Sequence, residues 1–514
     1  GGSSPAGRCR PPRPVPPLPV GARPRCRSAG AKPGAMGADT RADRPLERGE
    51  LRAWYAYDWA NSAYYQAAIV VFIPLLVNGM ADDFAWSRAD ATRPPACDSD
   101  AWTAAMYDFG ATCTQCVAGK GDRLFPGDLD VPKQSLPGGI DPLSLTFLVL
   151  SLSVLAQALT FVSFGPLGDV GAARRRGLVA CSCVGSVATM LFMVLPASGA
   201  DGGLYWLGAV LTVVSNVALG TSIVFYNSYL PLLVEASPDV RAKREEGSDK
   251  VQGARAARES EYSQKGMGWG YAGGTACLLI DVALALGLSN WLRARTLLAL
   301  CIFVPGLWWF GFSLWSFRYF TDRIVPSEVV PTLRTVVGYG WRSTADTLRD
   351  ARQHTQVFLF LVLWFFFSDG FGTIATVAAI FARTEMCFSL LETTVLAVVV
   401  PACAMAFCFV FLWIQKMTKW SAKGFLIGHL LAMGAIPAWG CVGFFTEAVG
   451  LHHKAEFWVI AVLYGANLGS AQAFARSIFG SMIPPGREAQ WYSLYEITDK
   501  GSSWLGPLVA SLLI

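Results

Sequence analysis

The chain has 514 residues, of which 53% are hydrophobic and 15% charged, and its mean hydropathy is +0.39. A soluble domain carries roughly a quarter charged residues, so this composition excludes an ordinary soluble protein and indicates an integral membrane protein. The apolar runs are long enough to cross roughly 30 Å of hydrocarbon as helices, and they lack the alternation of barrel strands. The net charge of +5 does not require a nucleic-acid partner, because the basic residues lie where a membrane protein needs them.

Residues 1–50 form a leader that we expect to be disordered. It is rich in proline, arginine and glycine, and its first acidic residue is Asp39. The prolines argue against an amphipathic transit helix, and Met36 offers a natural start. We therefore interpret residues 1–35 as translated upstream sequence.

We expect an all-α polytopic protein with about eleven membrane-spanning helices, each one an apolar run of sufficient length. The chain stops inside the last run, without a polar tail, so we also expect one further helix to be missing. The expected spans are residues 55–79, 143–166, 177–196, 204–233, 265–288, 295–317, 356–382, 389–414, 424–446, 456–482 and 489–514.

The distribution of Lys and Arg predicts which connectors face the cytosol. Connectors on this side of a membrane are enriched in basic residues. Here the basic clusters occur before the first span and then in every second connector, so they all lie on one side of the membrane. This arrangement predicts a cytosolic N-terminus. The clusters are Arg48 with Arg52, then Arg174–Arg176, 241–265, 318–352 and 416–423.

The long loop of residues 81–141 then lies on the luminal side. It contains Cys97, Cys113 and Cys116, which are candidates for a disulfide in an oxidising compartment. The single C-x-x-C within it lacks the second ligand pair that a zinc site needs, so we expect no metal there.

A polar linker, residues 321–354, separates an N-terminal half (51–320) from a C-terminal half (355–514). Three pairs of stretches match in the same order. "LGTSIVFYNSYL" matches "LGSAQAFARSIF", which places Asn227 opposite Arg476; "KGMGW" matches "KGSSW"; and Asp58 matches Asp369. A parallel duplication of six-helix units is typical of major facilitator transporters, which bind substrate between the halves.

Two acids are candidates for substrate or proton coupling. Asp369 is placed near the middle of its span, where an acid must face the protein interior or a watery cavity. It either couples protons or binds an amine, or it is a neutral acid that joins two helices. Asp58 forms a polar stripe with Asn61 and Gln66, which faces either a central cavity or the membrane interface.

Basic and amide side chains complete the candidate site. Arg476 needs an anion at this depth, which is either a substrate carboxylate or a structural partner among Glu496, Asp499 and Asp369. Asn227 and Gln472 are expected to orient the substrate. Asp499 and Lys500 are expected to form a charge pair that breaks and reforms between states.

The stretch "GPLGDVGAARRR" predicts a cytosolic gate. Asp169 is expected to cap a neighbouring helix while Arg174 and Arg175 anchor at the lipid headgroups, and the gate begins at Gly165. This pattern resembles the loop motif of major facilitator transporters.

Several segments together resemble the autophagy-related vacuolar amino-acid effluxer family of the major facilitator superfamily. They are "WYAYDWANSAYY", "FYNSYLPLL", "KGMGWGYAGG", "GLWWF", "SDGFGT" and "FARSIFGSMIPPGREAQWYSLYEITDKGSSWLGP". The resemblance extends from Leu51 to the end of the chain. It implies twelve helices and export of neutral amino acids, including leucine-like ones, from a degradative vacuole.

The predicted function is proton-coupled export of a neutral amino acid by alternating access. The alternatives are transport of another small solute and a transporter-like nutrient sensor without net flux. An enzyme is not expected, because the sequence shows no nucleophile with a base, no metal-ligand cluster, no phosphate loop and no intramembrane histidine. No cofactor is expected either.

Overall fold

The computed structural model describes residues 44–88, 135–140, 142–321, 335–349, 352–384, 386, 388, 390–446 and 448–501. Within these ranges every long element is a helix, and ten helices are long and apolar enough to cross a membrane. They match the first ten predicted spans. The eleventh begins as α16 (Glu488–Lys500), and its continuation lies outside the described residues, as do Cys97, Cys113 and Cys116.

The first span is a continuous helix that changes its winding in the middle. A π-helical segment, η2 (Tyr64–Phe72), separates α1 from α2, and π-helical turns occur often at functional sites. The other spans before the linker are long α-helices with short helices between them. The bounds are α1 (Arg48–Ala63), α2 (Ile73–Arg88), α4 (Leu145–Phe164), α5 (Ala173–Met190), α6 (Tyr205–Asn227), α9 (Val251–Leu288) and α10 (Ala294–Phe317).

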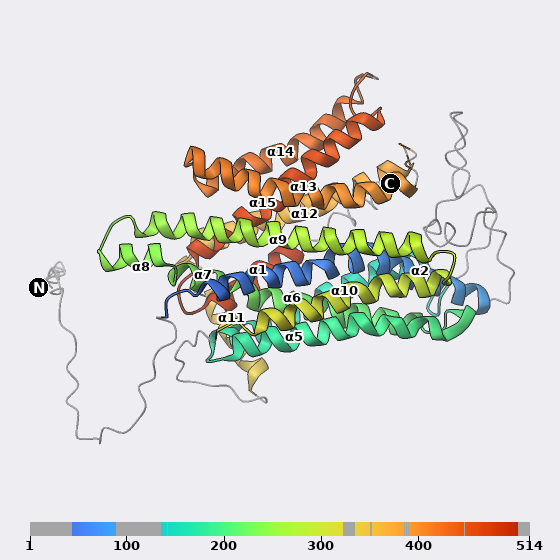
Figure 1. Cartoon of the computed structure of the whole chain (residues 1–514), viewed down its shortest axis with the longest axis horizontal. Helices are drawn as coiled ribbons and strands as arrows, with labels where there is room; N and C mark the ends of the chain where they lie inside the picture. The colour runs from blue at the N-terminus through green and yellow to red at the C-terminus, as the bar shows by residue number, and fades with distance from the viewer. Residues whose placement is uncertain are drawn as a thin grey trace, which may run out of the picture. The chain divides into compact units, whose positions relative to one another are not determined.

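After the linker come α12 (Thr355–Thr384), α13 (Leu390–Thr418), α14 (Ala422–Val442) and α15 (Lys454–Met482). Figure 1 shows α9 running between α1 and α13, and both helices contact it along much of its length. The short helices are η3 (Pro142–Ser144), η4 (Gly165–Asp169), η5 (Leu191–Asp201), α7 (Tyr229–Glu235), α8 (Pro238–Glu245) and α11 (Val336–Arg349).

One boundary differs from the sequence prediction, and one helix was not predicted. The loop expected from residue 81 begins later, because α2 continues to Arg88. The linker contains α11, whose buried residues Val336, Gly340, Thr344 and Thr347 recur every three or four positions. This helix therefore packs one face against the bundle and is not an extended polar connection.

Glycines allow α9 to pack closely against the first span. A Cβ atom at Gly266 would lie 2.7 Å from the Trp54 ring, one at Gly273 2.2 Å from the Trp59 carbonyl oxygen, and one at Gly274 2.3 Å from the Gln66 amide carbon. Small residues at three-to-four spacing let helix backbones approach in this way.

Replacing Gly273 by Ala is therefore expected to destabilise the protein by roughly 1–3 kcal/mol, because the backbone of α1 must move. Thermal unfolding of the purified protein measures this effect. The matched control is Gly287→Ala, since Gly287 lies on the same helix with no atom within 4 Å of the added methyl. Equal melting temperatures for the two variants would contradict the packing argument.

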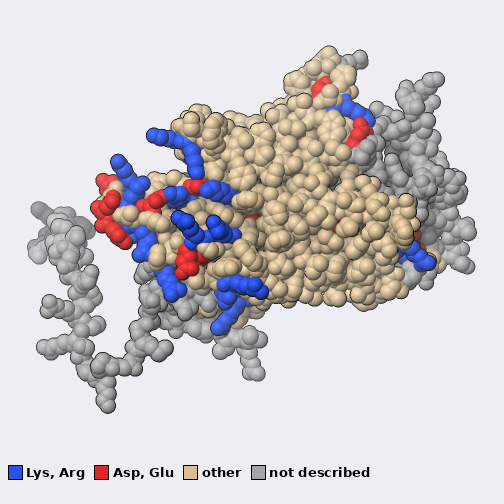
Figure 2. Space-filling view, viewed as in Figure 1, with Lys and Arg blue, Asp and Glu red and all other residues tan. Residues whose placement is uncertain are grey.

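Charged side chains gather at one end of the molecule, which we call the charged end. Figure 2 shows Lys, Arg, Asp and Glu concentrated there, over α8 and the beginning of α9, while most of the visible face between the ends is uncharged. Among the ion pairs at this end are Arg244 with Glu235 and Arg258 with Asp239.

Candidate functional site

Arg476 on α15 occupies a buried position among α1, α6 and α9. It is 4% exposed, and each of its three nitrogens has an acceptor. Nε donates to Ser263 Oγ at 2.9 Å, Nη2 donates to the Ser263 carbonyl oxygen at 2.9 Å, and Nη1 donates to Asn227 Oδ1 at 3.2 Å. Arg476 Nη1 also lies 3.5 Å from Asp58 Oδ2, so a span from each half contributes one charge to this ion pair.

An aromatic wall surrounds the ion pair. Tyr226 Oη donates a hydrogen bond of 2.6 Å to Asp58 Oδ2, and the rings of Trp54 and Tyr226 stack with centroids 4.7 Å apart. The Arg476 guanidinium lies 5.2 Å from the centre of the Trp54 ring. Such cation–π contacts strengthen when water is excluded, so this wall lowers the cost of burying the arginine.

A second acid joins the network through Asn227. Asn227 accepts from Arg476 and donates through Nδ2 to Glu496 Oε1 at 2.8 Å. Glu496 Oε2 in turn lies 4.0 Å from Lys500 Nζ on the same helix. The network contains two acids, Asp58 and Glu496, and two bases, Arg476 and Lys500.

The acid that pairs with Arg476 differs from those named by the sequence. The predicted anion was a substrate carboxylate or one structural partner among Glu496, Asp499 and Asp369, and the structure places Asp58 at this position. Asn227 and Arg476, which occupy matching positions in the two repeated stretches, contact each other directly. The fourth spans of the two halves therefore meet at this point.

The remaining predicted residues lie around this network. Asn61 is buried, and its Nδ2 has no acceptor among the described residues; Gln66 contacts Gly274. Gln472 Oε1 accepts from Tyr271 at 3.1 Å. Asp499 Oδ1 accepts from Trp364 at 2.8 Å and from Ser368 at 2.9 Å, while Asp369 is half-buried on α12.

The predicted gate residues form a latch between the two halves. Asp169 accepts backbone N–H bonds from Ala489 at 2.8 Å and Gln490 at 2.9 Å, and so caps the N-terminus of α16. Arg174 Nη2 lies 3.0 Å from Asp169 and 3.1 Å from Glu488. A carboxylate is stabilised at a helix N-terminus by the free N–H groups and the helix dipole.

The gate prediction was wrong about Arg174 as a headgroup anchor. Its side chain is 4% exposed, because both of its acidic partners are inside the protein. Arg175 is half-buried and donates to the Phe317 carbonyl oxygen at 3.0 Å. Gly165 lets η4 approach α16 closely, since a Cβ atom at this position would lie 1.6 Å from Ser493 Oγ.

Histidine at position 429 is a further correction, because no intramembrane histidine was expected. His429 is buried in α14, where its Nδ1 lies 2.8 Å from Asn467 Oδ1 and its ring stacks on Phe474. These contacts are those of a packed helix–helix interface. Among the described residues no three His, Cys, Asp or Glu side chains are placed to hold a metal ion.

Two buried acids on α9 were missed. Glu259 is 0% exposed, and neither of its oxygens has a hydrogen-bond donor among the described residues. Asp281 is equally buried, and within the described part of the chain the one donor to its carboxylate is the Cys277 thiol, at 3.9 Å from Oδ2. The signal for Asp281 was available, as it interrupts the apolar run "LLIDVALAL".

We expect Glu259→Gln to leave the folded protein at least as stable and to flatten the pH dependence of the transport activity that the sequence predicts. An ionised carboxylate without a donor is costly to bury, and an amide removes both the charge and the proton. The groups that face Glu259 are Arg255 on its own helix, Glu235 on α7 and Tyr492 on α16.

Transport by both forms, measured from mildly acidic to mildly alkaline pH, checks this expectation. The control is Glu246→Gln at an exposed position beside α8. An unchanged pH profile in the Glu259 variant would remove this acid from the transport cycle.

Comparison with known proteins settles the family. The family described as "Vacuole effluxer Atg22 like" matches residues 46–514. The chain belongs to this family. Autophagy-related protein 22-1 of Penicillium rubens is 28% identical over 91% of this chain and 86% of its own length. Autophagy-related protein 22 of Neurospora crassa is 29% identical over 92% of this chain and 68% of its own length.

Solved structures confirm the major facilitator fold of this Atg22-like chain. The human organic anion transporter MFSD10 superposes with a TM-score of 0.57, covering 91% of this chain and 94% of that one at 12% identity. A bacterial homologue of the iron transporter ferroportin gives 0.53, covering 91% and 93% at 13% identity. The chain is therefore a multi-pass membrane transporter for a small molecule, not an enzyme.

Proposed function

We propose that this Atg22-like protein exports neutral amino acids from the vacuole to the cytosol by alternating access, coupled to protons. The observation that supports the substrate class is the buried ion pair between Asp58 and Arg476, whose charged atoms lie 3.5 Å apart. An α-amino acid carries one carboxylate and one ammonium group. It can replace this internal pair, with its carboxylate on Arg476 and its ammonium on Asp58.

The surroundings of the pair favour an uncharged substrate side chain. Trp54 and Tyr226 offer aromatic surface, and the other two charges of the network, Glu496 and Lys500, already lie near each other. A further charge on the substrate would lack a partner in a site with little water, which costs several kcal/mol.

The latch supports the alternating-access cycle. We assign the charged end to the cytosol because basic connectors face that side. Asp169, Arg174 and Glu488 hold the two halves together near this end, so this conformation is closed toward the cytosol. Release of the substrate requires these contacts to break, and Glu259 and Asp281 offer sites for the coupled proton.

Counterflow in proteoliposomes tests the proposal. Vesicles loaded with unlabelled leucine are expected to accumulate labelled leucine, whereas vesicles loaded with glutamate or lysine accumulate much less. A proton gradient is expected to drive net leucine flux. Binding of leucine without exchange would instead support a sensor, and exchange of organic anions alone would support another cargo.

A further inference from the structure

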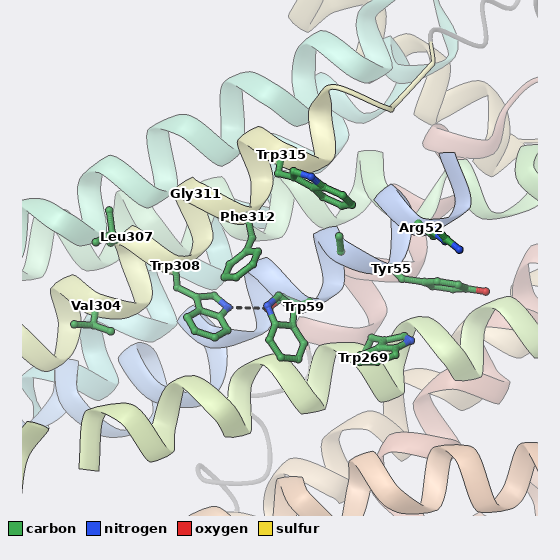
Figure 3. A pocket seen from close by; sticks show the side chains of 11 residues that line it. Arg52, Tyr55, Trp59, Trp269, Val304, Leu307, Trp308, Gly311, Phe312 and Trp315 are labelled. Carbon is green, nitrogen blue, oxygen red and sulfur yellow. Dashed lines mark hydrogen bonds between the residues drawn. The ribbon is translucent and has the colours of Figure 1, made fainter. Parts of the chain in front are cut away.

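A groove on the outside of the bundle has no role in the proposed transport cycle. It lies between α1, α9 and α10 and has a volume of about 830 Å³. Figure 3 shows its side chains, with Arg52 near one end of the row and Val304 and Leu307 at the other. All three helices are candidate membrane spans, so the groove opens toward lipid and not toward water.

The walls of the groove are aromatic and accessible. Trp59 and Trp308 stack with ring centroids 5.5 Å apart, and Trp308 Nε1 donates to the Trp59 carbonyl oxygen at 3.2 Å. Trp269 is 46% exposed and Leu307 51% exposed, although both line the groove. A shaped apolar surface of this kind inside a membrane must be covered by something equally apolar.

The length of the groove matches one leaflet of the bilayer. Its lining residues on α10 extend from Val304 to Trp315, a rise of roughly 16 Å at 1.5 Å per residue. The hydrocarbon core is roughly 30 Å thick, so the groove reaches from one interface to about the bilayer centre. This is the space that one acyl chain of a phospholipid occupies.

Arg52 is the one charged residue among those that line the groove. It is exposed on the first turns of α1, near the charged end, and none of the described acids pairs with it. A guanidinium presents several donors in a planar fork that suits a phosphate, and it draws anionic lipid headgroups to the interface. The positive charge of Arg52 and the apolar shape of the groove therefore fit one molecule with an anionic headgroup and an apolar chain.

We propose that this groove is a binding site for an anionic glycerophospholipid, with its phosphate on Arg52 and one acyl chain along Trp59, Trp308 and Leu307. The lipid comes from the leaflet at the charged end. It contacts the face of α1 that carries Trp59, the neighbour of Asp58 in the chain, and it joins α1, α9 and α10 across their shared groove. This inference depends on the fold and not on the transported substrate.

Two variants separate headgroup recognition from chain binding. Arg52→Gln removes the charge at an exposed position, and Lys423→Gln is its control at an exposed basic position on α14. Gly311→Leu fills the groove without an internal clash, since no atom lies within 4 Å of an added Cβ, and Gly434→Leu is its control on α14 for the same reason.

The test uses the full-length protein, purified and stripped of lipid, with phosphatidic acid and phosphatidylcholine of identical chains as probes. Native mass spectrometry measures retention, and thermal unfolding measures both folding and stabilisation. Phosphatidic acid is expected to bind at least about tenfold more tightly than phosphatidylcholine, because the choline cation offsets the phosphate charge in phosphatidylcholine and phosphatidic acid has no such cation. Arg52→Gln is expected to abolish this preference, and Gly311→Leu to weaken both lipids, while the two controls behave as wild type.

Three results would overturn the proposal. Equal retention of both lipids by the wild type would mean annular lipid only. Equal behaviour of Arg52→Gln and Lys423→Gln would remove Arg52 from the site. Displacement of phosphatidic acid by glycerol phosphate as effectively as by the intact lipid would show that the groove does not hold the chain. Because Arg52 is exposed, its variant stays informative even where the groove-filling variant fails to fold.

Discussion

Replacing Arg476 by Gln is expected to abolish amino-acid exchange. The change removes the donor for the substrate carboxylate, and among the residues that the structure describes it leaves the buried Asp58 with the Tyr226 hydroxyl as its one partner. Breaking a buried ion pair by removing one member costs roughly 3–5 kcal/mol, so thermal stability is expected to fall as well. Counterflow and thermal unfolding measure the two effects.

The double variant Asp58→Asn with Arg476→Gln separates folding from transport. Removing both charges eliminates the uncompensated carboxylate, so most of the lost stability is expected to return. Exchange is expected to stay absent, because neither charge of the substrate then has a partner. A double variant that recovers exchange together with stability would reduce the ion pair to a structural bridge.

Replacing Asp169 by Asn is expected to open the latch at the charged end. The carboxylate joins the N-terminus of α16 to Arg174, and losing its charge leaves Glu488 as the one ionised partner of Arg174 among the described residues. A loss of roughly 3 kcal/mol shifts the balance between closed and open conformations by about a hundredfold. Exchange is expected to fall, because the closed state becomes rare.

The distance between spin labels at Arg176 and Arg487, both exposed and on opposite sides of the latch, reports this opening in a cysteine-free background. The control is Asp346→Asn. Asp346 forms an exposed pair with Arg349 on α11, and such pairs contribute little. Unchanged label distances in the Asp169 variant would show that other contacts hold the gate.

The spans and the capping role of Asp169 were predictable from sequence because their signals are local, whereas the burial of Arg174 was not. Apolar runs define the helices, and Asp169 follows a turn sequence that points to a helix N-terminus nearby. The internal repeat also identified Asn227 and Arg476 as matching positions. Their direct contact could not be predicted, because it depends on how the two halves pack together. The sequence left open whether Asp58 lies at the membrane interface or in the protein interior. Its burial depends on the glycines of α9, which pack directly over it.

Residues whose burial depends on distant segments escaped prediction. Glu259 lies in a charged stretch, 255–265, that reads as solvated, yet Gly480 and Tyr492 cover it; a Cβ at Gly480 would lie 2.8 Å from each side chain. Helix α11 was missed inside a polar linker, although its small and apolar residues recur at helical spacing. In both cases the partner surface lies more than a hundred residues away along the chain.

The central claim is that a substrate with both an ammonium and a carboxylate group replaces the contact between Asp58 and Arg476. Competition by leucine analogues in the counterflow assay measures this directly. Leucinamide, which lacks the carboxylate, and N-acetylleucine, which lacks the ammonium, are both expected to compete at least about tenfold more weakly than leucine. Competition by either analogue as strong as that by leucine itself would contradict the account.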